Sequence, residues 1–504
     1  MKSSKIWYPI NSGGAFRKWY GNQTTIANWL HDGKEMKEDA IRRNNGSHWS
    51  RYIVGVDKYY QEGISWNAIS SGKICLRYFG EGFLIGHSSV CGFCNNNNYV
   101  MALLNTPVST SILQILSPTV NFGSTQVNKL PIIYKSESII DSLVQQNISI
   151  SKQDWDAHET SWDFQRNPLY EQFLECMEDD LQNVIPSGTS LEELSKFAVA
   201  EAMHPLTTCM HNYKDKWEMN FMRLHKNEEE LNRQFIDIYG LQDELTPDVP
   251  LNEITVLQQG EISIENDRIK WHDDVVMKQF ISYAVGCIMG RYSIDKPGLI
   301  LANQGDGVNE YNENVPNSRF EVDDDGIIPI MTSDTEFADN AIHRFKQWLA
   351  IAFGDTHLVE NLNFIEGALG KSLDDYFVKD FWKDHKKMYQ NRPIYWLFAT
   401  KKGAFQCIAY MHRMNAYTAE RIRTKYLLPH IEWLMQKQSE MEENAANLST
   451  GERKKLDSIH KQLDECREYH DRLHVVADEQ IAFDLDDGVV VNYAKFGDVV
   501  QKIK

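Results

Sequence analysis

The chain has 504 residues, of which 42% are hydrophobic and 24% charged, and this composition is typical of a globular protein of two to four domains. No segment approaches the ~20 apolar residues needed to cross a bilayer, and no secretory signal opens the chain. The eight cysteines lack the spacing of a disulfide framework, which fits a reducing compartment. We therefore expect a cytoplasmic protein with no membrane partner.

Charge is unevenly distributed along the chain. The net charge of −19 argues against nucleic acid as a partner of the whole surface. Residues 1–135, however, contain 14 lysines and arginines against 7 acidic residues, whereas the remainder contains 38 against 64. Phosphate binding requires a local positive field rather than a positive total, so residues 1–135 are the candidate nucleic-acid-binding domain. The alternative is that a mildly basic domain is simply a soluble one.

Residues 1–135 are expected to form a mixed α/β domain of short elements. A helical run extends from Tyr99 to Leu116, and Pro107 is expected to kink or divide it. β-branched and aromatic residues bounded by glycines predict strands at Ile6–Ile10, Tyr52–Val56, Ile74–Phe79 and Phe83–Gly86.

The next segment, residues 136–300, has a helical and acidic pattern and is predicted to be a scaffold domain. Helical periodicity extends over Met219–Tyr239, where Gly240 is expected to end the helix, and Val276–Tyr292 is predicted to be another strong helix. Glu192–Met203 shows the same periodicity.

The last two segments are predicted to be a mixed α/β unit at 301–415 and a helical hairpin with a C-terminal tail at 416–504. In the hairpin, apolar residues recur every three or four positions from Leu456 to Leu473 and form a one-sided stripe. The strands expected in the mixed unit are Gly326–Ile330, Arg392–Phe398 and Phe405–Met411. The predicted fold class is thus α+β, with an N-terminal mixed α/β domain, a mostly helical scaffold, a small strand-containing unit and a long hairpin.

Short motifs that suggest catalysis or metal binding are incomplete. Asp323–Gly326 and Asp484–Gly488 do not continue into the spaced acidic ligands of an EF-hand and are interpreted as acidic turns. Cys91 and Cys94 could be joined by His87, but a second ligand pair for structural zinc is missing.

One further motif, Asn167-Pro-Leu-Tyr170, differs from the Asn-Pro-Pro-Tyr with which adenine methyltransferases bind a flipped base. No glycine-rich cofactor loop precedes it. We therefore expect no catalytic residue and no metal site in the chain.

Long blocks of the sequence resemble, in order, one family. The resemblance is to the target-recognition region and following segments of PglX-type adenine-specific DNA methyltransferases of bacterial BREX phage-defence systems, which are related to single-chain restriction-modification enzymes. It covers essentially the whole chain and is carried by the blocks "WYPINSGGAFRKWYGN", "YYQEGISWNAISSGKICLRYFGEGF", "LLNTPVSTSILQILSPTVNF", "VNKLPII", "ISKQDWDAHETSWDFQRNPL", "NEEELNRQFIDIYGLQDELTPDV", "ISYAVGCIMGRYSID", "DDDGIIPI", "RPIYWLFATKKGAFQCIAYMHR" and "DLDDGVVVNYAKFGDV".

The resemblance implies that residues 1–135 read the DNA target and that the acidic remainder is a scaffold. Full-length members carry an upstream methyltransferase domain with the S-adenosylmethionine loop and Asn-Pro-Pro-Tyr, and this chain does not contain them. We therefore expect the chain to bind no cofactor and to be inactive alone. Its expected partners are double-stranded DNA, a separate methyltransferase catalytic chain or domain, and other BREX proteins.

Two alternatives remain open. The chain is a non-catalytic interaction protein that binds BREX components or phage proteins through its acidic surface, or it is an enzyme with an active site of its own. The missing motifs make the second alternative the weaker of the two.

The resemblance and the basic charge together suggest DNA-binding residues. Arg17 and Lys18 are expected to contact phosphate or a guanine edge, Asn22 to read adenine, and Trp19 and Tyr20 to pack beside the backbone or support the loop. For the aromatic residues a place in the core is the alternative. The full set of candidate DNA-binding residues is Arg17, Lys18, Tyr20, Asn22, Lys58, Lys73 and Arg77.

Overall fold

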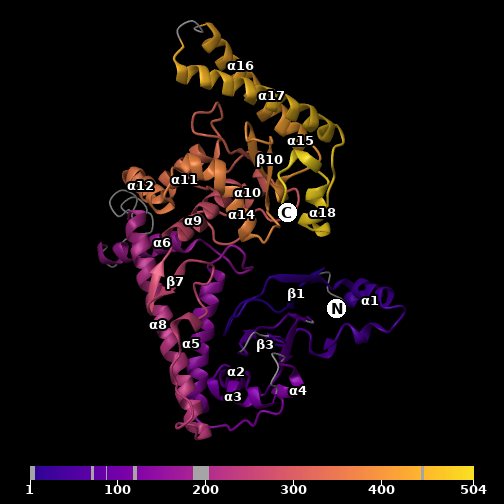
Figure 1. The fold of residues 1–504 in the computed structure, drawn as a ribbon, viewed down its shortest axis with the longest axis vertical. Helices are drawn as coiled ribbons and strands as arrows, with labels where there is room; N and C mark the ends of the chain where they lie inside the picture. The colour runs from indigo at the N-terminus through magenta and orange to yellow at the C-terminus, as the bar shows by residue number, and fades with distance from the viewer. Residues whose placement is uncertain are drawn as a thin grey trace. The chain divides into compact units, whose positions relative to one another are not determined.

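The computed structural model describes residues 6–69, 73–86, 88–116, 122–184, 204–443 and 448–503 (Figure 1). The chain forms two compact units, the first made of residues 1–164 and 214–272 and the second of residues 165–213 and 273–504. The long helix α8 (Leu206–Tyr239) contains one of the points where the chain passes between units. The boundaries of these units fall within the predicted segment 136–300 and do not follow the four segments expected from the sequence. The division into four domains remains a prediction.

In the part that the structure describes, the first unit contains two three-stranded sheets and one hairpin. In the first sheet β1 pairs with β2 antiparallel and with β5 parallel, and in the second sheet β3 pairs antiparallel with both β4 and β6. Asn266 and Asp267 both have positive φ, as the tight turn of hairpin β7–β8 requires. The strands are β1 (Trp7–Asn11), β2 (Thr25–Asn28), β3 (Gly63–Asn67), β4 (Leu76–Phe79), β5 (Leu84–Ile85), β6 (Ser89–Gly92), β7 (Ile262–Glu265) and β8 (Arg268–Trp271).

Helices support these sheets. In Figure 1 the long helices α5 and α8 run side by side, and Asn227 of α8 donates to the Oδ1 of Asn147 on α5 at 2.9 Å. The helices of this unit are α1 (Leu30–Arg43), α2 (Asn97–Leu104), α3 (Pro107–Leu116), α4 (Ser124–Val127), α5 (Glu137–Asp156) and the later part of α8, with short 3-10 turns at Trp49–Arg51, Val56–Lys58 and Leu251–Glu253.

Pro107 divides the predicted helix as expected. It begins α3, and the axes of α2 and α3 differ by 74°. Together the two helices have the length and apolar character of a membrane span, but α2 is mostly buried within the first unit. Among the described residues, no single helix is long and apolar enough to cross a membrane.

The predicted strand at Tyr52–Val56 is wrong. Tyr52 closes the turn Trp49–Arg51, donating its N–H to the carbonyl of Trp49 at 2.9 Å, and Gly55 has a left-handed φ of 68°. Ile53 and Val56 are apolar because they pack against the cluster of Trp29, Tyr59 and Leu84, not because they pair with a strand. The three other predicted strands of this region overlap β1, β4 and β5, and are confirmed.

The second unit is mostly helical around one small sheet. Strand β11 (Gln406–Tyr410) lies between β10 (Tyr395–Ala399) and β9 (Ile327–Pro329), antiparallel to both, and every residue of the three strands is buried. The predicted strand pair and the strand at Gly326–Ile330 are therefore confirmed. This sheet is the centre of the unit's core.

The helices of the second unit cover this sheet and form the predicted hairpin. Helices α16 and α17 run side by side (Figure 1), and the residues of the apolar stripe from Ile459 to Leu473 are buried. The main helices are α6 (Pro168–Val184), α9 (Asp273–Ile288), α10 (Val308–Asn314), α11 (Ala341–Phe353), α12 (Leu358–Leu369), α13 (Leu373–Tyr376), α14 (Trp382–Met388), α15 (Thr418–Arg421), α16 (Leu428–Glu443), α17 (Thr450–Asp478) and α18 (Val489–Ala494).

Shorter turns complete the unit. Two π-helical turns, Phe377–Phe381 and Ile422–Leu427, precede α14 and α16, and 3-10 turns lie at Asp355–His357, Met411–Arg413, Leu485–Asp487 and Gly497–Val499. Small sheets among many helices confirm the predicted α+β class. The helix expected at Glu192–Met203 lies outside the described residues.

Candidate nucleic-acid interface

The loop between β1 and β2 has an exposed tip and a buried return. Gly14, Ala15 and Phe16 are exposed, whereas the next five residues, 17–21, are all buried. Polar contacts hold the tip: Gly13 donates its N–H to the Oγ of Ser88 at 3.0 Å, and Asn67 donates its amide to the carbonyl of Gly14 at 2.7 Å. The tip is therefore presented to solvent on a fixed base.

Arg17 anchors this base to helix α5. Its guanidinium forms a 2.6 Å ion pair with Asp154 and donates through Nε to the carbonyl of Tyr20 at 2.7 Å. It also lies over the ring of Trp155, 5.0 Å from the centroid. The side chains of Arg17 and Asp154 are only 5% and 1% exposed. The positive charge of Arg17 is therefore paired inside the unit and does not face solvent.

Lys18 and Trp19 anchor the same base to helix α8. The ammonium of Lys18 pairs with Glu228, and the indole N–H of Trp19 donates to the other oxygen of that carboxylate at 2.7 Å. The backbone of Trp19 also bonds β4: its N–H donates to the carbonyl of Leu76, and its own carbonyl accepts from Tyr78, both at 2.8 Å. Trp19 takes a left-handed φ of 70°, which these contacts on both sides enforce.

Arg77 lies beneath the tip and is only 1% exposed. Its guanidinium donates to the Oδ1 of Asn67 at 3.2 Å and to the carbonyl of Arg17 at 3.4 Å. Burial lowers the pKa of this guanidinium from its usual value. Arg77 therefore supports the residue that holds Gly14, and it has no exposed surface to offer a ligand.

The remaining predicted residues differ in exposure. Tyr20 is 7% exposed, and its hydroxyl donates to Gln23 at 3.1 Å, while burial raises its pKa. Asn22 is half-buried, has a φ of 61°, and donates to the carbonyl of Ala15 across the loop at 2.9 Å. Lys58 and Lys73 are exposed.

Lys73 makes an ion pair with Glu253 at 2.5 Å, and the two side chains are 53% and 27% exposed. Arg17 and Lys18 likewise pair with acidic residues from beyond position 135. The first unit as a whole contains 22 basic and 26 acidic residues. The excess of basic residues in 1–135 is therefore partly balanced by acidic residues that follow position 135 in the sequence but belong to the same unit.

Sequence reasoning missed three exposed basic residues of the same region. Arg51, Lys129 and Lys135 are exposed, and none of them has an ion-pair partner in the part of the chain that the structure describes. These three residues are among the 14 lysines and arginines counted in residues 1–135, but no sequence motif marked them as DNA-binding candidates. They present free positive charge, which Arg17 and Lys18 do not.

The Asn167–Tyr170 motif has a structural place in the second unit. The Oδ1 of Asn167 accepts the N–H of Leu169 at 3.0 Å and so caps the start of α6. Tyr170 is fully buried and donates its hydroxyl to the carbonyl of Ile294 at 3.2 Å. Neither side chain is available to a base.

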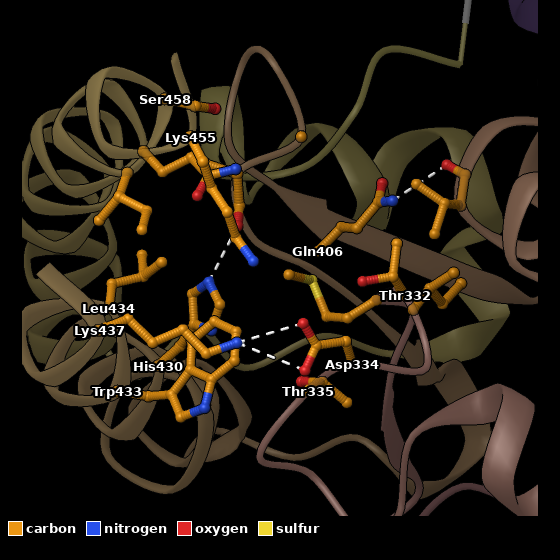
Figure 2. Close-up of a pocket in the computed structure, with 17 residues that line it drawn as sticks. Thr332, Asp334, Thr335, Gln406, His430, Trp433, Leu434, Lys437, Lys455 and Ser458 are labelled. Carbon is orange, nitrogen blue, oxygen red and sulfur yellow. Dashed lines mark hydrogen bonds and ion pairs between the residues drawn. The ribbon is translucent and has the colours of Figure 1, made fainter. Parts of the chain in front are cut away.

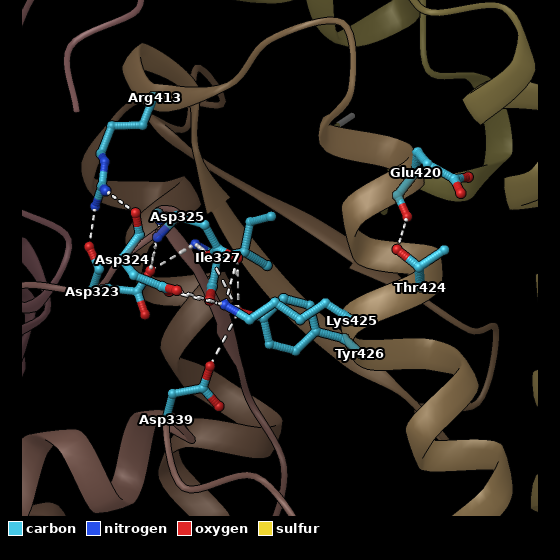
Figure 3. Close-up of polar contacts among 11 residues, drawn as sticks. Asp323, Asp324, Asp325, Ile327, Asp339, Arg413, Glu420, Thr424, Lys425 and Tyr426 are labelled. Atoms are coloured by element: carbon cyan, nitrogen blue, oxygen red, sulfur yellow. Dashed lines mark hydrogen bonds and ion pairs between the residues drawn. The ribbon is translucent and has the colours of Figure 1, made fainter. Parts of the chain in front are cut away.

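The Asp323–Gly326 turn is held by polar contacts within the chain (Figure 3). The Oδ1 of Asp323 accepts the N–H of Gly326 at 2.6 Å, and Lys425 pairs with Asp324 at 2.9 Å and with Asp325 at 2.8 Å. Burial and the neighbouring charge of Asp325 raise the pKa of Asp323 to about 7. The Lys425 ammonium thus lies between the carboxylates of Asp324 and Asp325.

The environment of Cys91 and Cys94 favours the protonated thiol over the thiolate. The Sγ of Cys91 accepts the amide of Asn11 at 3.6 Å, and burial raises its pKa to about 11. Burial also raises the pKa of Cys94. Zinc binds the thiolate form, which this environment disfavours. His87 lies outside the described residues.

Comparison with known proteins confirms the resemblance drawn from the sequence blocks. No family model matches the chain. Two curated relatives are adenine-specific methyltransferases: the protein named BrxX from Escherichia coli O9:H4 (strain HS) is 33% identical over 100% of this chain, and the one named PglX from Lacticaseibacillus casei (strain Zhang) is 36% identical over 98% of it. The chain spans 40% and 39% of their lengths. It is thus a homologue of part of the BrxX and PglX methyltransferases.

Proposed function

We propose that the chain is the DNA-recognition part of a BREX-type adenine-N6 DNA methyltransferase that acts in phage defence. The observation that carries this proposal is the similarity of the whole chain to about two fifths of two adenine-specific methyltransferases. The tip at Gly14–Phe16 supports it, because an exposed loop on a rigid base suits the reading of a DNA groove. The free cysteines of the chain suit the cytoplasm, where we place it.

The DNA contacts that we propose differ from those expected from the sequence. Arg17, Lys18 and Arg77 hold the loop from inside, and Tyr20 packs beneath it. Lys58 and Lys73 from the original set remain, and Asn22 stands at the edge of the tip. Arg51, Lys129 and Lys135 join them as candidate phosphate contacts because their charges are free.

Salt dependence tests this assignment. Each phosphate contact adds about 0.9 to the slope of log K against log salt, so Lys58→Gln and Arg51→Gln are each expected to lower the slope by about 1. The measurement is fluorescence anisotropy of a labelled duplex titrated with the full chain between low and moderate salt. Lys461→Gln is the matched control, since Lys461 is an exposed lysine of α17 in the other unit. Absence of duplex binding at low salt would refute the proposal.

Catalysis and cofactor binding are assigned to the part of the relatives that this chain does not span. S-adenosylmethionine is expected to bind there, and a separate catalytic chain or domain is the required partner. We expect no methyl transfer by this chain alone, and transfer to adenine when the remaining three fifths of a relative is supplied with it. The measurement is incorporation of labelled methyl groups into duplex DNA. Transfer by this chain alone, in a preparation free of other methyltransferases, would contradict the division of labour.

A second candidate function rests on charge. The second unit contains 30 basic and 45 acidic residues, which favours a protein-binding surface for basic partners, including other BREX components or phage proteins. Association that persists in a chain whose DNA binding is lost would favour this role.

A further inference from the structure

A pocket of about 260 Å³ lies in the second unit, between the base of the α16–α17 hairpin and the loop that follows β9 (Figure 2). Its apolar wall includes Met331, Leu434 and Ile459. Its polar lining comes from both helices of the hairpin, from the loop and from Gln406 of β11, so separate segments of the chain meet around one space. The volume lies just below the usual range of small-ligand sites, about 300–1,000 Å³, which suits a molecule no larger than a mononucleotide.

Two lysines enter this pocket from different helices. Figure 2 shows Lys437 of α16 and Lys455 of α17 directed toward the same opening, with Asp334 across from them. Lys455 has no ion-pair partner among the described residues. Lys437 pairs with Asp334 at 3.3 Å, but the side chain of that aspartate is 79% exposed, so water screens the pair.

The floor of the pocket is fixed. His430 is 2% exposed, and its Nδ1 lies 2.8 Å from a carboxylate oxygen of Glu336 while its Nε2 lies 3.0 Å from the carbonyl of Ala404. The ring can donate to both acceptors only in its imidazolium form. Lys437 in turn lies over the ring of Trp433, 3.6 Å from the centroid, which limits where its ammonium can go.

The pocket is unusual for its surroundings. The unit around it has a large excess of acidic residues, yet the lysines and acidic residues of the pocket lining are two lysines and one aspartate. An arrangement that gathers ammonium groups without equal counter-charge favours an anion. Ser458 and Thr332 add hydroxyl groups at the rim.

We propose that this pocket binds a small phosphorylated ligand of mononucleotide size, with its phosphate between Lys437 and Lys455. The phosphate offers three acceptor oxygens, which matches two ammonium groups better than a single carboxylate does. Because the lysines belong to α16 and α17, the bound phosphate joins the two helices at the base of the hairpin. The site is independent of the DNA surface proposed for the first unit.

Isothermal titration calorimetry of the full chain with adenosine 5′-monophosphate tests the site. We expect saturable binding by one site, competition by inorganic phosphate, and no binding of adenosine, which lacks the phosphate. Lys455→Gln and Lys437→Gln are each expected to weaken binding about tenfold, the usual loss when one charge-assisted hydrogen bond is removed.

Lys454→Gln is the matched control. Lys454 is the exposed neighbour of Lys455 on the same helix and does not line the pocket. Equal weakening by Lys454→Gln and Lys455→Gln would overturn the proposal, because it would indicate general attraction to the surface. Failure of both adenosine 5′-monophosphate and inorganic phosphate to bind, or binding of succinate alone, would also overturn it.

Discussion

Replacement of Lys18 by methionine is expected to destabilise the chain by about 3–5 kcal/mol, the usual cost of removing one partner of a buried ion pair. The reason is that Glu228, whose side chain is 4% exposed, would keep the Trp19 indole as a donor but lose its counter-charge. Urea titration of the purified chain measures the change, and hydrogen exchange of residues 17–22 locates it.

The control uses a lysine from the same sequence-based set. Lys73→Met removes an ion pair whose lysine is half exposed, and the expected loss is at most about 1 kcal/mol. The double variant Lys18→Met/Glu228→Gln should recover part of the stability, since the uncompensated charge is gone. Equal losses for Lys18→Met and Lys73→Met would show that Lys18 is not anchored as described.

Replacement of Asp323 by asparagine is expected to stabilise the chain at neutral and higher pH. The pKa of Asp323 is raised to about 7 by burial and by Asp325, above the usual carboxyl value, so the folded chain holds a proton that the unfolded chain has released. The wild type therefore loses stability as pH rises from about 4 through 7, by up to about 4 kcal/mol. Asparagine cannot titrate, and its Oδ1 can still accept the N–H of Gly326. The measurement is the difference in unfolding free energy between variant and wild type across this range.

Asp324 is the matched control with the opposite sign. Burial acts to raise its pKa, but the hydrogen bond and charge of Lys425 prevail and lower it. Asp324→Asn should therefore remove a contribution that is present above the usual carboxyl pKa and lost at lower pH. A variant–wild-type difference for Asp323→Asn that stays constant from pH 4 to 8 would refute the raised pKa.

Local patterns in the sequence predicted the regular elements well. The division of a helix by Pro107, the strand pair β10–β11 and the apolar stripe of α17 all depend on residues close together in the chain, and all are confirmed. The strand at Tyr52–Val56 was wrongly predicted, because an aromatic and β-branched run also suits a turn that packs on a core. Helix α1 was missed, since it is polar and its second to fourth residues, His31 to Gly33, have positive φ.

The roles of the basic residues could not be predicted in this way. Lys18 and Lys73 look alike in sequence, and each has an acidic partner about 200 positions away, in a helix or turn that the local pattern does not connect to it. Only the tertiary structure distinguishes the buried pair from the exposed one. Arg17 was chosen for its charge and aromatic neighbours, and those same neighbours belong to its internal packing.

Within the loop between β1 and β2, neighbouring residues are expected to differ sharply in how well they tolerate mutation. At Gly21, with a φ of 125°, a Cβ would lie 2.3 Å from the Nε of Arg17, so this position and the anchored residues before it resist change. Phe16 and Ala15 are free of such contacts on their exposed sides. We therefore expect substitutions at the tip to leave the stability of the unit unaffected. Under the proposed function, natural diversity among relatives is expected to be concentrated there.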